Sequence, residues 1–140
     1  MSKSIPTDLQ MLQAIYDGYH EEFGKFTKGD GGRSSKIYVP IDIERIARDL
    51  QVDGDLVFGR LYYHLEHKYG YKQADGVSVC FFALRAGNDI HCVNFPFMAA
   101  VLADLQDESR KHNLAIWIAV GSLILSAVSV AIAVLLKQQT

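Results

Sequence analysis

Residues 43–70, IERIARDLQVDGDLVFGRLYYHLEHKYG, predict two helices joined by a tight turn. Asp42 precedes the first helix as a favourable N-cap residue, and apolar side chains follow it at three- and four-residue intervals. The turn QVDGD combines a glycine with aspartates, which favour turns and helix starts. The second helix is expected to bury one apolar stripe: Val57, Phe58, Leu61, Tyr62, Leu65 and Tyr69. Two helices joined by a short turn with glycine form a helix-turn-helix motif.

The residues before this motif predict a helix, a loop and a strand. Thr7 and Gln10 have the spacing of a capping box, so a helix is expected over 7–25. Its apolar side chains recur on one face: Leu12, Ile15, Tyr16, Tyr19, Phe23 and Phe26. Glycine and serine in 27–36 predict a flexible loop, and KIYVPI at 36–41 predicts a short edge strand that ends at a proline.

The residues after the motif predict a β-hairpin and a further helix. GVSVCFFAL at 76–84 and DIHCVNF at 89–95 flank the turn sequence RAGN. Pro96 opens a helix whose inward stripe is Met98, Val101, Leu102 and Leu105. No proline or glycine interrupts 97–120, so either one helix continues toward the C-terminus or Asn113 ends it.

The C-terminal part of the sequence predicts a transmembrane helix over 113–136, followed by a short tail over 137–140. Residues 114–136 contain no charged side chain, and serine is the only polar type among them. A helix of this length extends over about 34 Å, and a bilayer core is about 30 Å thick. A buried core helix is the alternative, but such helices seldom run far beyond about 14 residues without polar relief.

Charge and composition predict the orientation of this helix. Arg110, Lys111 and His112 precede it and only Lys137 follows, so the positive-inside rule places the N-terminal domain in the cytoplasm. The first ten residues contain no apolar stretch, and we therefore expect a tail-anchored protein. Of the 14 Lys and Arg, 13 lie before the helix together with all 16 Asp and Glu, so the domain is mildly acidic.

The order helix, strand, helix, helix, hairpin, helix resembles the winged-helix variant of the helix-turn-helix fold. The apolar pattern of Ile43, Ile46, Ala47, Leu50 and Val52, followed by Val57, Arg60 and Leu61, is similar to its two central helices. The resemblance covers about residues 8–106. The expected class is therefore α+β: a winged-helix-like domain over 1–112, followed by a single transmembrane helix.

The resemblance implies a binding surface on the second helix and on the hairpin. Most winged-helix domains place this helix in the major groove of DNA and the hairpin beside the backbone. The residues implied to bind the partner are Arg60, Tyr63, His64, His67, Lys68, Tyr71, Arg85 and Asn88. Basic and acidic residues balance over 53–72, whereas DNA binding needs an excess of Lys and Arg. Tyrosine is enriched at protein interfaces, so we expect a protein partner, with a DNA-binding regulator as the alternative.

Other chemistry is less favoured by the sequence. His64 and His67 lie one helical turn apart, but two histidines without further ligands rarely bind a metal, and none is expected. No spacing of nucleophile, base and acid suggests catalysis, so we expect neither enzymatic activity nor a cofactor. Cys80 and Cys92 are expected to be small core residues.

The transmembrane segment has one face of small residues. At about 100° per residue, this face contains Ala115, Ala119, Ser122, Ser126, Ser129 and Ala133. Small residues let membrane helices approach closely, so the face predicts self-association, although alanine and serine are also common in spans generally. Three hypotheses follow: a membrane-anchored adaptor, a membrane-tethered DNA-binding regulator, and an oligomeric effector that senses a ligand and perturbs the bilayer.

Overall fold

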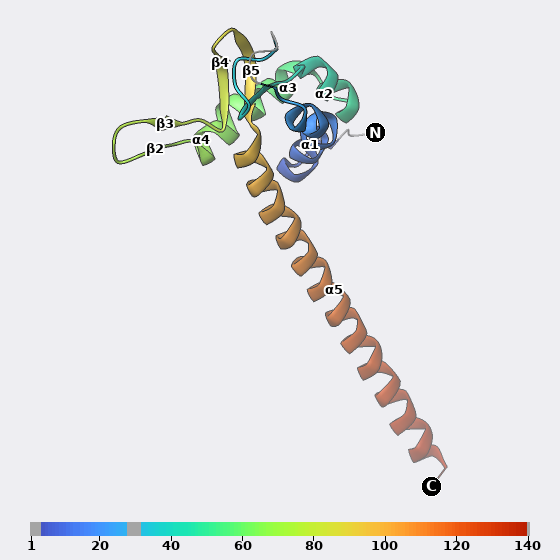
Figure 1. The fold of residues 1–140 in the computed structure, drawn as a ribbon. Helices are drawn as coiled ribbons and strands as arrows, with labels where there is room; N and C mark the ends of the chain where they lie inside the picture. Colours follow the sequence, from blue (N-terminus) through green and yellow to red (C-terminus); the bar gives the residue numbers. More distant parts are fainter. Residues whose placement is uncertain (1–3, 28–31, 140) are drawn as a thin grey trace. The chain divides into compact units, whose positions relative to one another are not determined.

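The computed structural model describes residues 4–27 and 32–139. The chain divides into two compact units, Met1–Ala103 and Asp104–Thr140. The first unit is globular and mixes helices with a β-sheet, and the second consists of the C-terminal part of one long helix (Figure 1). The predicted mixture of helix and sheet before a long apolar helix is therefore confirmed.

Helix α1, Asp8–Gly24, begins at the predicted capping box. The Gln10 N–H donates to Thr7 Oγ1 at 3.2 Å, and the Thr7 N–H donates to Gln10 Oε1 at 2.9 Å. Two backbone donors at the start of the helix are thereby satisfied. The buried face consists of Met11, Leu12, Ile15 and Tyr19, so it includes Met11, which the predicted stripe omitted.

The two predicted helices joined by a tight turn are present, and the second of them is modified. Helix α2, Ile43–Leu50, is capped by Asp42, and α3, Gly54–Gly59, is capped by Asp53. The chain then continues as a π-helical segment η1, Arg60–Leu65, and as α4, Glu66–Tyr69. Between the two caps, Gln51 adopts a left-handed φ of 56°, which ends α2.

The π-helical segment changes which side chains are buried. Val57, Leu61 and Leu65 are fully buried, so the buried stripe advances by four residues per turn. A π-helix closes its hydrogen bonds five residues apart and therefore has a wider turn than an α-helix. Tyr62, predicted to be buried, is 36 % exposed because it lies off this stripe.

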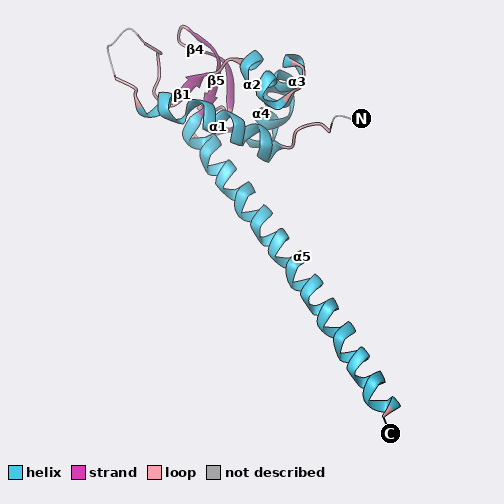
Figure 2. Cartoon of the chain, turned by 90° about the vertical axis from the view of Figure 1, so that its right-hand side faces the viewer, coloured by secondary structure: helices cyan, strands magenta, loops and turns pink. Residues whose placement is uncertain are grey.

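Three antiparallel strands form the main sheet, in the order β1-β5-β4: β1, Tyr38–Pro40; β4, Phe82–Ala86; and β5, Asp89–Asn94. Figure 2 shows them side by side. Tyr38 is opposite Asn94, and Phe82 is opposite Val93. The first strand is at an edge, as predicted, and the hairpin around Gly87 is confirmed, with φ of 63° at that glycine.

A second, two-stranded hairpin was not predicted. It consists of β2, Tyr71–Lys72, and β3, Ser78–Val79, and Figure 1 shows it extending away from the rest of the globular unit. The predicted strand 76–84 is thus divided between β3 and β4. The division follows from Glu66, whose Oε2 accepts the N–H groups of both Phe81 and Phe82 at 2.7 Å. Successive N–H groups of a regular strand point to opposite sides, so two that meet one oxygen interrupt the strand.

The end of the predicted loop is attached to α1. Residues 28–31 of the loop 27–36 lie outside the described residues. The Arg33 guanidinium donates to the carbonyl oxygens of Glu22 at 2.9 Å and Phe23 at 3.2 Å. It donates to the carbonyls of Ser35 and Lys36 as well. A cation that satisfies the last carbonyls of a helix stabilises the helix end.

Helix α5, Phe95–Gln138, runs without interruption, so the alternative in which Asn113 ends it is wrong. Asn94 caps it, because its Oδ1 accepts the Phe97 N–H at 3.3 Å. In the first unit α5 buries Phe95, Met98, Val101 and Leu102. In the second unit the helix is long and apolar enough to cross a membrane, and residues 114–136 are all exposed.

Replacing Glu66 by Ala should lower the free energy of unfolding by about 2–3 kcal/mol, because two backbone N–H groups lose a charged acceptor. Glu66→Gln should lower it less, since a neutral acceptor remains. Urea unfolding of the full chain in detergent, followed by circular dichroism in the aromatic region, measures both changes. Glu22→Ala is the control, since Glu22 is exposed, and should change stability by less than about 0.5 kcal/mol. Equal effects of the two alanine variants would contradict the role of Glu66.

Candidate functional site

The consecutive helical segments α3, η1 and α4 carry five of the predicted partner-binding residues. Tyr63, His64, His67 and Lys68 are exposed, and Arg60 is partly buried. Tyr63 is the most accessible of the aromatic side chains of this surface, with 73 % exposure. The structure therefore places this part of the predicted site on one stretch of helix.

Two of these residues are engaged within the chain. Arg60 Nε lies 2.6 Å from Asp8 Oδ1, and His64 Nε2 lies 3.2 Å from Asp8 Oδ2. The Asp8 side chain is only 14 % exposed, so this ion pair is partly shielded from water. It connects the first turn of α1 to η1. Sequence reasoning missed Asp8, because its partner is 52 residues away.

The pKa of the Asp8 carboxyl reflects these contacts. Partial burial by itself raises this pKa, but the hydrogen bonds and positive charges of Arg60 and His64 outweigh it. The pKa of Asp8 is therefore lowered from its ordinary value. The charged Asp8 carboxylate therefore neutralises the positive charge of Arg60. The DNA-binding hypothesis depends on that charge.

The other predicted residues lie on separate elements. Tyr71 belongs to β2 and not to the second helix, because the helix ends at Tyr69. Its ring lies 6.0 Å from that of Phe97. Arg85 is exposed in β4, and Asn88 lies in the following turn, where its N–H donates to Ser34 Oγ at 3.1 Å.

Tyr63 is the first member of a row of aromatic side chains that the sequence did not predict. The ring centroids of Tyr63 and Tyr62 are 5.0 Å apart, and those of Tyr62 and Phe58 are 5.5 Å apart. Phe58 also contacts the His91 ring at 5.6 Å. His91 adopts a left-handed φ of 52° within β5, which is uncommon for a residue other than glycine. We call Tyr63, Tyr62, Phe58 and His91 the aromatic row.

The aromatic row ends at a cavity of about 390 Å³ between α2, α3 and β5. Its apolar and aromatic part consists of Ile41, Ile43, Phe58, Ile90 and His91. Its complete lining is Ile41, Asp42, Ile43, Glu44, Gly54, Asp55, Phe58, Ile90 and His91. We call this space the α2–β5 pocket. Its composition is acidic and aromatic.

The cysteines and histidines of the chain are potential metal ligands. Across residues 4–27 and 32–139, no group of three or more His, Cys, Asp or Glu is arranged to hold a metal ion. Burial and the charge of Glu66 raise the pKa of the Cys80 thiol. Burial and the charge of Asp89 raise the pKa of Cys92, against an opposing hydrogen bond from the backbone of Ala86. Both thiols are therefore held in the neutral form, which is the less reactive one.

The predicted small-residue face lies on the exposed part of α5. Ser122, Ser126 and Ser129 each donate their hydroxyl to the carbonyl four residues earlier, at 2.9 Å. Their donors are thus satisfied inside the helix, and the hydroxyl oxygens stay available as acceptors. The alanines Ala115, Ala119 and Ala133 are exposed.

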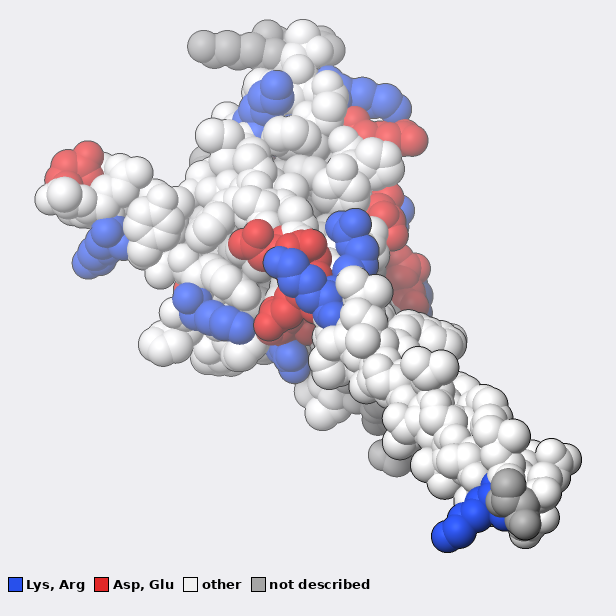
Figure 3. Space-filling view, turned by 90° about the horizontal axis from the view of Figure 1, so that it is seen from below, with Lys and Arg blue, Asp and Glu red and all other residues white. Residues whose placement is uncertain are grey.

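The charged side chains form no one-signed area on the face drawn in Figure 3, where Lys and Arg lie interspersed with Asp and Glu. Together these features define a mixed helix-and-sheet unit whose last helix continues into a segment able to span a membrane. Comparison with protein-family models, with curated proteins and with solved structures found no significant match to this chain.

Replacing Asp8 by Asn should lower the free energy of unfolding by about 1–2 kcal/mol near neutral pH, because Arg60 loses its charged partner. A carboxyl with a lowered folded-state pKa contributes stability above its unfolded-state pKa of about 3.9. That contribution disappears as the pH falls through the folded-state pKa. The difference between wild type and Asp8→Asn should therefore shrink below about pH 4 and then vanish.

Urea unfolding at a series of pH values measures this difference, with Asp49→Asn as the control for an exposed aspartate. A difference that stays constant down to the lowest pH would show that Asp8 acts through packing and not through its charge.

Proposed function

We propose that this chain is a single-pass membrane protein whose winged-helix-like N-terminal domain faces the cytoplasm and holds a protein partner at the membrane, without catalysing a reaction. One observation carries the proposal: a unit with its own buried core precedes a helix whose apolar segment, 114–136, is exposed throughout. A helix that is apolar on all sides is stable in lipid and unfavourable in water.

The element order supports the winged-helix-like assignment. A helix and a short strand precede the helix-turn-helix, and the hairpin β4–β5 follows it. The first strand pairs with the last, which gives the sheet order β1-β5-β4. The last strand therefore lies between the other two, and the sheet combines an early strand of the unit with its last two strands.

The residues that flank the apolar segment support the membrane assignment and its orientation. Trp117 is 73 % exposed near the start of the segment, and tryptophan is enriched at membrane interfaces. Arg110, Lys111 and His112 precede the segment, whereas Lys137 alone follows it among Lys and Arg. This asymmetry favours a cytoplasmic N-terminal side by the positive-inside rule.

The charges favour a protein partner over DNA. Arg60, which the DNA-binding alternative places in the groove, is paired with Asp8 at 2.6 Å. The sequence before the span has more acidic than basic residues, and phosphate binding depends on an excess of Lys and Arg. Exposed Tyr62 and Tyr63, in contrast, are side chains enriched at protein interfaces.

A charged residue in the apolar segment should prevent membrane insertion. Leu125→Arg combined with Val128→Arg places two charges near its centre, at a cost of about 2.5–3.5 kcal/mol each. Fractionation of expressing cells and alkaline extraction should recover wild type and Asp104→Arg in the membrane pellet and the double variant in the supernatant. A protease added to intact cells should leave the N-terminal domain uncut.

Recovery of wild type in the soluble fraction would remove the membrane assignment. Cleavage of the N-terminal domain in intact cells would remove the proposed orientation.

We propose in addition that the helices of several copies associate through the small-residue face. Ala115, Ala119, Ser122, Ser126, Ser129 and Ala133 alternate at four- and three-residue steps, the repeat of a left-handed coiled coil. The absence of large side chains on this face allows close approach, and the serine oxygens are available to accept weak hydrogen bonds.

Single cysteines placed along 115–133, in a chain with Cys80 and Cys92 replaced, should form disulfides between copies in the membrane. Oxidative crosslinking should be strong at Ala119, Ser122 and Ser126 and weak at Ile124 and Val128, which lie opposite. Non-reducing electrophoresis measures the dimer fraction. Equal crosslinking around the helix would contradict a specific contact.

A further inference from the structure

The aromatic row and the α2–β5 pocket form one continuous surface. Phe58 belongs to both, since its ring stacks on Tyr62 and also lines the pocket. Ile90, which also lines the pocket, is 53 % exposed, and Tyr63 is 73 % exposed. Exposed apolar and aromatic side chains that adjoin a pocket are typical of protein interaction sites.

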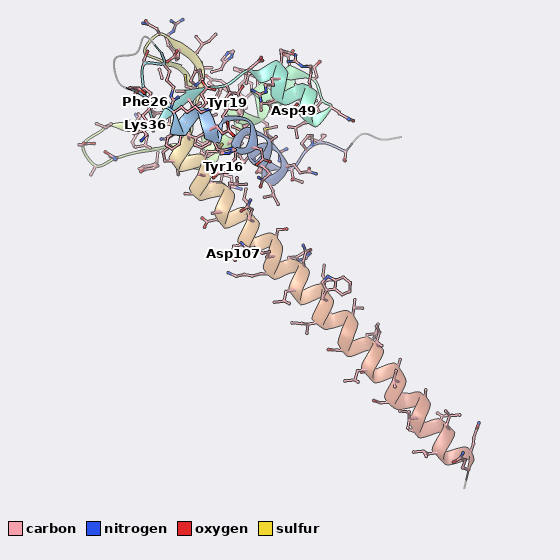
Figure 4. The ribbon with its side chains drawn as sticks, turned by 45° about the vertical axis from the view of Figure 1, so that its right-hand side comes forward. Tyr16, Tyr19, Phe26, Lys36, Asp49 and Asp107 are labelled. Atoms are coloured by element: carbon pink, nitrogen blue, oxygen red, sulfur yellow. The ribbon has the colours of Figure 1, made fainter. Side chains whose placement is uncertain are left out.

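The ionisable groups of this pocket determine the charge of its occupant. Asp42, Glu44 and Asp55 line it, and no Lys or Arg among residues 4–27 and 32–139 does. The Arg45 guanidinium, which is close in sequence, lies 5.2 Å from the Tyr19 ring, which Figure 4 labels on α1. Asp42 caps α2, accepting the Arg45 N–H at 3.1 Å.

The carboxylates of Glu44 and Asp55 are available for a partner. Within residues 4–27 and 32–139, neither side chain has a hydrogen bond or an ion pair. The Glu44 carboxylate lies against Gly54, where a side chain would occupy its place. Gly54 therefore lets this carboxylate lie at the start of α3, beside Asp55.

We infer that the α2–β5 pocket receives a lysine or arginine side chain from a segment of a partner protein, and that the aromatic row receives the apolar side chains next to it. A cation gains free energy from the carboxylates and from the aromatic ring of Phe58. The stem of a lysine or arginine is apolar and suits the contact with Ile90. This inference rests on the proposed adaptor function and specifies the chemistry of its partner.

The same surface is unsuited to the other occupants. Nucleic acid phosphates are repelled by three carboxylates without a neighbouring Lys or Arg in the lining. A bare metal ion finds no group of three ligands among residues 4–27 and 32–139. A basic and apolar peptide satisfies the carboxylates and covers the exposed tyrosines at once.

The probe is a phage-displayed library of random peptides, selected on the full chain in lipid nanodiscs against empty nanodiscs. Peptides that combine Lys or Arg with a neighbouring aliphatic or aromatic residue should be enriched. Their binding is then measured by fluorescence anisotropy with synthetic peptides. Asp55→Lys and Glu44→Lys should each weaken binding about tenfold, since each replaces an attraction by a repulsion.

Asp49→Lys is the matched control, because it makes the same charge change at an exposed site of α2 that does not line this pocket. It should weaken binding less than about twofold. Tyr62→Ser should also weaken peptide binding, because it removes apolar contact area from the aromatic row. Asp55→Asn and Glu44→Gln are tested alongside in case charge reversal disturbs folding, which circular dichroism detects.

The inference is overturned if no peptide is enriched, if the enriched peptides lack basic residues, or if Asp55→Lys and Asp49→Lys have equal effects. A change of oligomeric state in Asp55→Lys would also overturn it, because the occupant would then be a second copy of the chain. Membrane recovery of the same variants is measured separately. Loss of peptide binding in a chain that remains in the membrane rejects this inference and leaves the membrane anchor intact.

Discussion

The carboxylate of Glu66 joins the helical part of the globular unit to its sheet. By accepting the N–H groups of Phe81 and Phe82 at 2.7 Å, it draws the start of β4 onto the end of the modified helix. Phe82 then lies within 6.0 Å of Phe58, measured between ring centroids. The interruption at these residues separates β3 from β4, so the hairpin β2–β3 is left outside the main sheet. This partly buried contact thus holds Phe82 of β4 near Phe58 of the aromatic row.

The surface chemistry of the unit follows from which charges are already satisfied. Arg60 and His64 both contact the Asp8 carboxylate, and the Arg33 guanidinium donates to carbonyls at the end of α1. Glu44 and Asp55 remain without such contacts among the described residues. We infer a basic partner at the α2–β5 pocket from these carboxylates, whereas the resemblance to winged-helix domains implies DNA. The expected charge of the partner thus follows from which charged side chains are already paired, and not from the fold class.

Helix α5 has two parts: one packs in the globular unit and the other is exposed. Its first turns bury Phe95, Met98 and Leu102 in the globular unit, and its later turns expose an apolar surface on every side. Helical periodicity accounts for the buried face of the first turns, since apolar residues return to one face every three or four positions. The exposed apolar surface of the later turns needs only uniformly apolar residues over a sufficient length. Both properties are local, which explains why the start of this helix and its apolar segment were predicted, whereas its continuity through Asn113 was left open.

The sequence by itself determined the helices, their caps, the edge strand and the apolar segment, because these depend on residues within a few positions of one another. Thr7 with Gln10, and Asp42 before α2, are examples of such local pairs. Only the tertiary structure decided that Arg60 pairs with Asp8, that Glu66 divides a predicted strand, and that Phe58 and His91 meet at a pocket. Each of these contacts joins residues far apart in the chain. Their energies depend on packing and on shielding from water, which residue spacing does not encode.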